Sequence, residues 1–163
     1  MSATNAEAST VEGVLSAGTP APDFTLATAP GEAVTLSEMA GPVVLIFYPA
    51  DFSPVCGDEL SMFQAADQLF AQRGAHLLAL SVDNVFSHVA FAQSRNLTFP
   101  LLADFNPKGA VARSYGVYRE DDGFNERALF VLDADHAVAW SFVSPVEVSP
   151  GVDGALAAVE ALS

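Results

Sequence analysis

The sequence contains very little cysteine, and this scarcity limits the chemistry available to it. Cys56 is the only cysteine among 163 residues, so no disulfide can form within the chain. The three histidines, His76, His88 and His136, lie at unrelated positions without cysteines or paired carboxylates at ligand spacing. We expect them to be ordinary surface or strand-end residues, and we expect neither a metal nor a cofactor. Cys56 is therefore either a buried, inert thiol or a reactive one.

Basic residues are scarce as well. Six Lys and Arg face twenty Asp and Glu, which gives a formal net charge of −14. Such a field repels phosphate backbones and anionic lipid surfaces, so neither a nucleic acid nor a membrane is expected as a partner. The simplest reading of the acidity is a solvated surface that maintains solubility and marks no partner.

Long hydrophobic runs are also missing, although 51% of the residues are hydrophobic. The longest apolar stretches, such as residues 43–48, are far shorter than the roughly 20 residues that cross a bilayer as a helix. Residues 1–13 are small, polar and acidic and lack the features of a secretory signal. We expect a disordered acidic tail over residues 1–13 and a single domain over residues 14–163, in a cytoplasmic protein.

The apolar residues that are present predict alternating strands and helices. Residues 43–48 and 75–82 are apolar without polar alternation, which is typical of strands buried on both faces. Residues 53–73, between them, show helical periodicity. Further helices are predicted at residues 87–95, from 108 or 109 to 115, and 151–162, and further strands at residues 98–102, 127–132 and 138–142, the last two joined as a hairpin through residues 133–136. This order predicts an α/β protein of thioredoxin-like arrangement, with a central mixed β-sheet flanked by helices.

The start of the 53–73 helix places the cysteine where a thiol can become reactive. Ser53 suits the N-cap, and Pro54 suits the first helical position, so Cys56 falls in the first turn. A thiol is a poor nucleophile until it ionises, and the free N–H groups and positive dipole end of a helix favour the thiolate. Asp51 and Asp58 lie near the thiol in sequence and would oppose ionisation unless their side chains point away; the sequence leaves their direction open.

A cation near the thiol would add to this effect, and the chain offers few candidates. Among the five arginines, Arg127 opens a predicted core strand, where a charge is costly to bury without a partner. It can stabilise the thiolate, or it can be a structural ion pair with Glu126 or Glu120. From the residues alone the two readings are about even.

Residues 47–56, Phe-Tyr-Pro-Ala-Asp-Phe-Ser-Pro-Val-Cys, resemble the peroxiredoxin signature Pro-x-x-x-Thr/Ser-x-x-Cys after a core strand. Other matching segments occur in the family's order: residues 20–26, Glu59, residues 99–104 and residues 115–117. The pattern is most similar to the one-cysteine peroxiredoxins of the alkyl hydroperoxide reductase E type. The bacterioferritin-comigratory group is the second most similar. Ser53 departs from the commoner Thr but retains the hydroxyl.

The resemblance implies a role for each matching residue. Cys56 would be the nucleophile that attacks peroxide, and Pro49 would shield it from water. Ser53 would hydrogen-bond the peroxide, and Arg127 would stabilise both the thiolate and the transition state.

Further residues have supporting roles under the same resemblance. The backbone N–H groups near Val55 and Cys56 would bind a peroxide oxygen, and Glu59 would orient the arginine. In addition, Phe47, Tyr48 and Phe52 are candidates to line an apolar mouth that accepts alkyl hydroperoxides.

The implied function is a thiol-dependent peroxidase acting on hydrogen peroxide, organic hydroperoxides or peroxynitrite, with a sulfenic acid formed on Cys56. Ser61 stands where some relatives place a resolving cysteine, and the chain has no other. Recycling would need an external thiol, such as thioredoxin, a glutaredoxin-like protein or a low-molecular-weight thiol. Related enzymes commonly form dimers, so a homodimer is expected.

Two other functions remain open. The protein can be a redox sensor or relay, in which oxidised Cys56 forms a mixed disulfide with a client protein. It can also be a binding module with a degenerate site, which fits less well because every expected chemical position is occupied.

Overall fold

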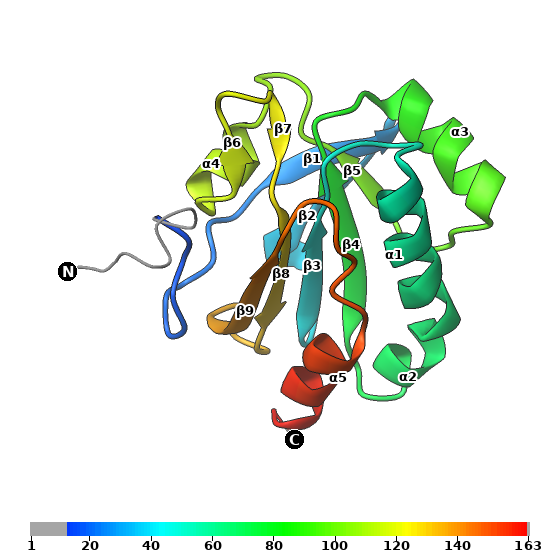
Figure 1. Ribbon diagram of the computed structural model, residues 1–163. Helices are drawn as coiled ribbons and strands as arrows, with labels where there is room; N and C mark the ends of the chain where they lie inside the picture. The colour runs from blue at the N-terminus through cyan, green and yellow to red at the C-terminus, as the bar shows by residue number, and fades with distance from the viewer. Residues whose placement is uncertain (1–12, 163) are drawn as a thin grey trace.

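The protein, described over residues 13–162 in a computed structural model, is built on a seven-stranded mixed β-sheet (Figure 1). The strand order is β2-β1-β5-β4-β3-β8-β9. These strands are β1 (Thr25–Ala29), β2 (Glu32–Thr35), β3 (Val43–Phe47), β4 (His76–Ser81), β5 (Leu101–Ala103), β8 (Arg127–Leu132) and β9 (Val138–Ser144). A separate two-stranded hairpin consists of β6 (Tyr118–Arg119) and β7 (Phe124–Asn125). The predicted tail, apart from Gly13, lies outside the described residues.

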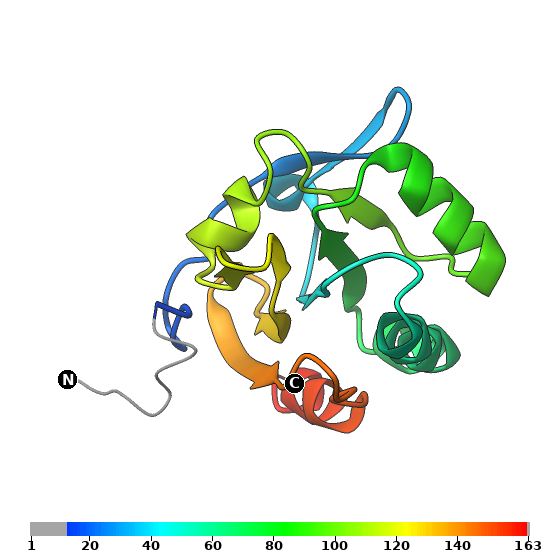
Figure 2. The ribbon, with the colours of Figure 1, turned by 45° about the horizontal axis from the view of Figure 1, so that its top comes forward.

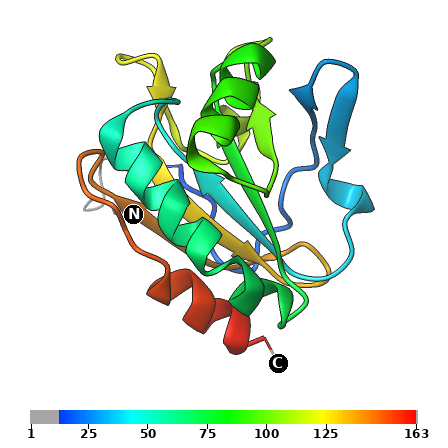
Figure 3. The same ribbon diagram turned by 90° about the vertical axis from the view of Figure 1, so that its right-hand side faces the viewer.

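Helices cover both faces of the sheet. They are α1 (Pro54–Ala65), α2 (Asp67–Ala71), α3 (Val85–Arg95), α4 (Ala110–Ser114) and α5 (Asp153–Glu160), with a 3-10 turn at Leu36–Glu38. Figure 2 shows α4 and α1 on opposite sides of the central strands, and Figure 3 looks onto the face that carries α1, α3 and α5. No helix within residues 13–162 is long and apolar enough to cross a membrane.

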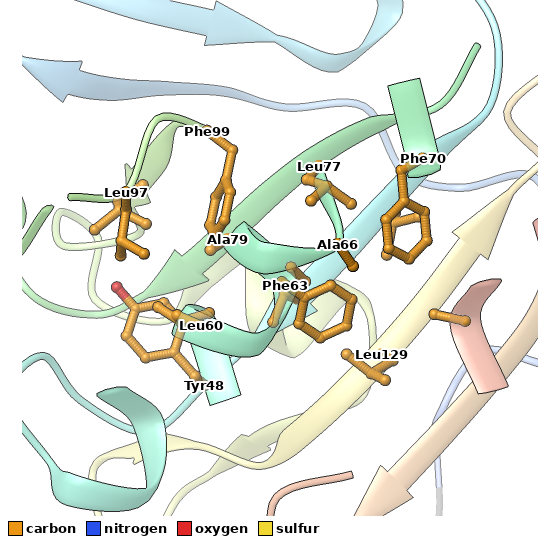
Figure 4. Packing of buried hydrophobic residues seen from close by; sticks show 14 of the residues in the cluster. Tyr48, Leu60, Phe63, Ala66, Phe70, Leu77, Ala79, Leu97, Phe99 and Leu129 are labelled. Carbon is orange, nitrogen blue, oxygen red and sulfur yellow. The ribbon is translucent and has the colours of Figure 1, made fainter. Parts of the chain in front are cut away.

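The central strand β3 explains why the sheet is mixed and why both faces are covered. All five residues of β3 are buried, and the strand pairs parallel with β4 and antiparallel with β8. Its side chains alternate between two cores: Val44 and Ile46 face the cluster under α1 and α5, whereas Leu45 faces the cluster under α4. Figure 4 shows the first cluster, in which Phe63 of α1 and Leu129 of β8 pack together. The predicted fold class, α/β with a thioredoxin-like central mixed sheet, is confirmed.

Most predicted elements occur within a few residues of their expected bounds, and the differences have local causes. The helix predicted over residues 53–73 is broken at Ala66, whose φ of −95° and ψ of 2° separate α1 from α2. The strand predicted from residue 98 begins only at Leu101, because Pro100 has no N–H to donate. The α3 helix starts before its predicted residue 87, because the Asn84 side chain caps it by accepting from Ser87 N at 3.0 Å.

Candidate active site

The first turn of α1 begins as the sequence predicts, but its cap is incomplete. Ser53 occupies the N-cap position and Pro54 the first helical position, so Cys56 lies in the first turn, wholly buried. Gly57 N donates to Ser53 O at 2.9 Å, so the preceding N–H groups of Val55 and Cys56 have no acceptor within the helix. The Ser53 hydroxyl makes no cap bond. The Ser53 hydroxyl and two amides of the first turn of α1 are therefore available to another partner.

Arg127 brings a guanidinium to this sulfur. β8 pairs antiparallel with β3, so its first residue lies at the end of β3 from which the chain leads to α1. Arg127 Nη1 lies 3.3 Å from Cys56 Sγ and 2.8 Å from Glu59 Oε1, and Nε donates to Val146 O at 2.7 Å. The side chain is 1% exposed. The guanidinium is thus fixed by three partners, one of them the sulfur.

The alternative ion pairs for Arg127 do not form. Glu126 pairs with Arg119 at 3.0 Å, and Glu120 pairs with Arg113 at 2.6 Å. The partner of Arg127 is Glu59 instead, so the arginine joins a buried ion pair and contacts the thiol at the same time.

Glu59 lies one helical turn after Cys56 and is completely buried. Its Oε1 accepts from Arg127, whereas Oε2 has no hydrogen-bond partner within the described residues. Burial raises the pKa of Glu59 to about 7, and the hydrogen bond to Arg127 acts in the opposite direction. The charge of the group beside the arginine therefore changes near neutral pH.

This raised pKa predicts a pH-dependent stability. Because the pKa of Glu59 is about 7 in the folded protein and 4.5 ordinarily, folding favours the protonated form. The free energy of unfolding should therefore fall as pH rises from about 4.5 to about 7, by up to about 3 kcal/mol from this group. Urea denaturation of the wild type and of Glu59→Gln across this range measures the effect.

The difference between the two proteins isolates Glu59. Burial also raises the pKa of Asp104, but that group is present in both proteins and cancels in the comparison. We expect the stability advantage of the wild type over Glu59→Gln to shrink as pH rises. Parallel stability profiles would contradict the assignment.

The aromatic candidates for the pocket are in three different environments. Phe47 is fully buried in the opposite core, with its ring centroid 5.3 Å from that of Tyr115, so the expectation that it lines the mouth is wrong. Tyr48 is buried on the Cys56 side of the sheet. Phe52 is 58% exposed and packs against Phe91 at 5.1 Å between ring centroids. Only Phe52 among the three reaches the surface.

Pro49 and the two nearby aspartates are also placed by the structure. Pro49 is buried and borders a cavity of about 370 Å³ that Asp83 and Phe105 also line. Asp58 points outward, with its side chain 74% exposed and Arg95 at 3.5 Å. The Asp51 side chain is 1% exposed and bonded to other groups, so neither carboxylate is paired with the thiol.

The three histidines lie in different environments, and only the position of His88, close to the loop before α1, was not expected from the sequence. His76 is exposed at the start of β4 and His136 lies in the β8–β9 turn, as expected. The expectation for His88 is wrong, because its side chain is 1% exposed and lies 2.8 Å from Asp51. The signal in the sequence was its spacing of three from Phe91 on one face of α3. Within residues 13–162, no group of three or more His, Cys, Asp or Glu side chains is arranged to hold a metal ion.

The sequence also matches a known protein family. The model of the AhpC/TSA family matches residues 17–141. The chain belongs to this family. It is 36% identical over 152 residues to peroxiredoxin 2 of Thermoplasma acidophilum, covering 89% of this chain and 75% of that protein. It is 38% identical over 122 residues to alkyl hydroperoxide reductase E of Mycobacterium tuberculosis, covering 74% of this chain and 80% of that protein.

Solved structures of AhpC/TSA proteins agree with this assignment. The peroxidoxin BcpB from Mycobacterium tuberculosis superimposes with a TM-score of 0.80 at 33% identity, covering 90% of this chain and 97% of that one. AhpC from the same organism gives a TM-score of 0.81 at 27% identity, covering 91% and 93%. Relatives that are 36% to 38% identical over most of the chain show that this AhpC/TSA member is a peroxiredoxin, a thiol-dependent peroxidase. Its single cysteine fits the one-cysteine type.

Proposed function

We propose that the protein reduces hydrogen peroxide, organic hydroperoxides or peroxynitrite by a one-cysteine mechanism at Cys56. The observation that carries this proposal is the Arg127 guanidinium 3.3 Å from Cys56 Sγ, at the start of a helix. The positive charge and the helix N-terminus both favour the thiolate. They are also positioned to stabilise the negative charge that develops on oxygen during attack.

In the proposed reaction, the thiolate attacks one peroxide oxygen in line with the O–O bond. The sulfur gives two electrons, an S–O bond forms and the O–O bond breaks, which leaves a sulfenic acid on Cys56. The other oxygen departs as hydroxide from hydrogen peroxide, as alkoxide from an organic hydroperoxide, or within nitrite from peroxynitrite; hydroxide and alkoxide then take a proton to become water or an alcohol. The Ser53 hydroxyl and the N–H groups of Val55 and Cys56 would hydrogen-bond the peroxide, and the buried Pro49 would limit access of water.

Recycling is proposed to use a thiol from another molecule. Ser61 in α1 cannot form a disulfide, and Cys56 is the only cysteine of the chain. Thioredoxin, a glutaredoxin-like protein or a low-molecular-weight thiol would therefore attack the sulfenic acid, forming a mixed disulfide with Cys56 and releasing water, and a second thiol would reduce this disulfide to restore the Cys56 thiol. The same absence of a second thiol supports the alternative of a redox relay, in which a client protein supplies that thiol.

Stopped-flow kinetics with mass spectrometry test the proposal. Reduced protein mixed with equimolar hydrogen peroxide should gain one oxygen atom on Cys56, which can be followed through the fluorescence of Trp140, the only tryptophan. We expect the reaction to be at least about 10²-fold faster than that of free cysteine, the gain expected from one well-placed donor. Peptide mapping must locate the oxygen, because Met39 and Met62 can also be oxidised. A rate no better than that of free cysteine would overturn the proposal.

The recycling step is tested on the oxidised protein. Each candidate thiol is added in turn to the oxidised protein. The physiological type of reductant should be the one that regenerates reduced Cys56 rapidly. A stable mixed disulfide with one protein partner and negligible turnover would instead favour the relay.

The proposal includes a homodimer formed through an exposed aromatic patch of Phe86 and Phe105, which are 71% and 51% exposed and line one cavity together. Phe105 also borders the cavity at Pro49, so the patch adjoins the active-site loop. Exposed aromatic side chains of this size commonly mark an interface. Sedimentation velocity should show a dimer that Phe86→Glu converts to a monomer, whereas Val148→Glu, at another exposed apolar position, should not. A monomeric wild type would remove this part of the proposal.

A further inference from the structure

A buried polar cluster holds the loop between β3 and α1. Asp51 in this loop and His88 in α3 have side chains that are each 1% exposed, with His88 Nδ1 2.8 Å from Asp51 Oδ2. Burying such groups is unfavourable unless they bond to each other and to further partners. The peroxidase roles described above use neither residue. The Asp51–His88 pair therefore acts through the loop between β3 and α1, to which Asp51 belongs.

Asp51 is fixed through both its side chain and its backbone. The Tyr48 hydroxyl donates to Oδ1 at 2.6 Å, and the Ser87 hydroxyl donates to Oδ2 at 2.8 Å. Asp51 N donates to Asp83 Oδ2 at 2.8 Å. Burial, followed by the neighbouring Asp51 charge, raises the pKa of Tyr48, which keeps its hydroxyl a donor at neutral pH. A residue two positions before Ser53 is thus anchored to residues that follow β3 and β4 and to α3.

His88 connects this anchored residue to the sheet. Its Nε2 lies 3.0 Å from the backbone carbonyl oxygen of Leu102 in β5. Because a carbonyl only accepts, Nε2 carries a hydrogen and donates it, which fixes the orientation of the ring. The other nitrogen, Nδ1, then faces the Asp51 carboxylate, which only accepts while it is ionised, so this contact is a hydrogen bond when Nδ1 carries a hydrogen as well. The imidazole spans from the rigid sheet to the loop.

The loop needs such an anchor because its next residue is strained. Phe52 has a φ of +66°, in the left-handed region that costs a residue with a Cβ about 1 kcal/mol or more. The chain turns there from β3 into α1, and the Phe52 ring rests on Phe91 of α3. If Asp51 were released, this turn could relax, and the Ser53 hydroxyl and the first amides of α1 would shift relative to the sulfur.

We infer that His88 is a positioning residue for peroxide reduction: through Asp51 it holds the 49–53 loop so that Ser53 and the start of α1 face Cys56. The inference rests on the proposed peroxidase chemistry at Cys56. His88 does not touch the sulfur; it acts through the loop. Small displacements of such groups reduce rates strongly, with about 10²-fold for a misplacement of about 1 Å.

Two substitutions of His88 separate its two hydrogen bonds. Asn places an amide nitrogen near the Nδ1 position and keeps a donor toward Asp51, whereas Gln places one near the Nε2 position and keeps only the donor toward Leu102 O. We expect His88→Gln to lower the second-order rate with hydrogen peroxide by about 10-fold or more. His88→Asn should remain within about threefold of the wild type, because the bond that fixes the loop is retained.

A second readout distinguishes positioning from general damage. Alkylation of Cys56 by iodoacetamide needs the thiolate, which Arg127 still favours in both variants, but not the Ser53 hydroxyl, so its rate should fall much less than the peroxide rate. Equal losses of peroxide rate in the two variants, or losses that alkylation shares, would overturn the inference. If His88→Gln does not fold, Ser87→Ala removes another donor to the same carboxylate and should lower the peroxide rate alone.

The behaviour of the wild-type protein shows whether the role of His88 or the proposed peroxidase function has failed. A wild-type protein that peroxide does not oxidise at Cys56 would overturn both. A wild type that reacts rapidly, together with a His88→Gln variant that reacts equally fast, would overturn only the role of His88.

Discussion

Replacing Cys56 by Ser is expected to abolish peroxide reduction, with a loss of at least about 10³-fold in turnover with any thiol reductant. A hydroxyl ionises far less readily than a thiol and cannot pass through a sulfenic acid and a mixed disulfide. Because Cys56 is fully buried and Ser is almost the same size, the fold should be preserved. A coupled assay that follows peroxide consumption measures the loss.

The matched control is Met62→Leu. Met62 lies in the same helix and is 45% exposed, so peroxide can oxidise its thioether, but it has no part in the proposed chemistry. We expect Met62→Leu to leave turnover unchanged. If peroxide consumption survived in Cys56→Ser and disappeared in Met62→Leu, the reacting sulfur would be that of Met62, and the assignment of Cys56 would be wrong.

Removal of the Arg127 guanidinium is expected to lower the rate of Cys56 oxidation by about 10²- to 10³-fold, the usual effect of removing one oriented donor to a developing negative charge. Within residues 13–162, Arg127 Nη1 is the only side-chain group that hydrogen-bonds the Cys56 sulfur. The single variant Arg127→Met would leave buried Glu59 without its ion-pair partner, which destabilises a protein by about 3–5 kcal/mol. The rate should therefore be measured in the double variant Arg127→Met/Glu59→Gln, which removes both charges together.

Two further variants make the result specific. Glu59→Gln alone should remain active, because the guanidinium stays close to the sulfur. Arg113→Met removes an exposed arginine paired with Glu120 and should have no effect. If the double variant oxidised as fast as the wild type, Arg127 would be a structural residue and not a stabiliser of the transition state.

The part of the fold that the sequence predicted well is the part with strong hydrophobic patterns. The continuous apolar run of β3 and the run of β8 from Arg127 leave little choice but buried central strands. The hairpins β1–β2 and β6–β7 were missed, because their strands are only two to five residues long and mix apolar with polar or charged residues. The break at Ala66 was missed for a related reason, since alanine favours a helix and only tertiary packing ends α1 there.

The candidate site also contains residues that the sequence pointed to and contacts that only the structure shows. The sequence singled out Cys56, Ser53 and Pro49 from their spacing and Arg127 from its place at the start of a core strand, and Arg127 Nη1 lies 3.3 Å from the sulfur although 71 positions separate the two residues. The residues alone favoured Glu120 or Glu126 as the partner of Arg127, because both are nearer in sequence, and only the family resemblance pointed to Glu59. His88 was misjudged because its spacing from Phe91 was the only sign of burial, and its partner Asp51 lies 37 positions away.

The complete burial of Cys56 imposes different size limits on the two halves of the catalytic cycle. A peroxide needs only an opening wide enough for two bonded oxygens to reach the sulfur. A thiol carried by another protein brings a whole surface, so under the proposed mechanism it would reach the sulfur only when the first turn of α1 opens. Oxidation should therefore rise in proportion to peroxide concentration, while re-reduction should saturate at the opening rate of the helix, however much reductant is supplied. Under this proposal, the motion of one helical turn would determine how fast the enzyme is restored.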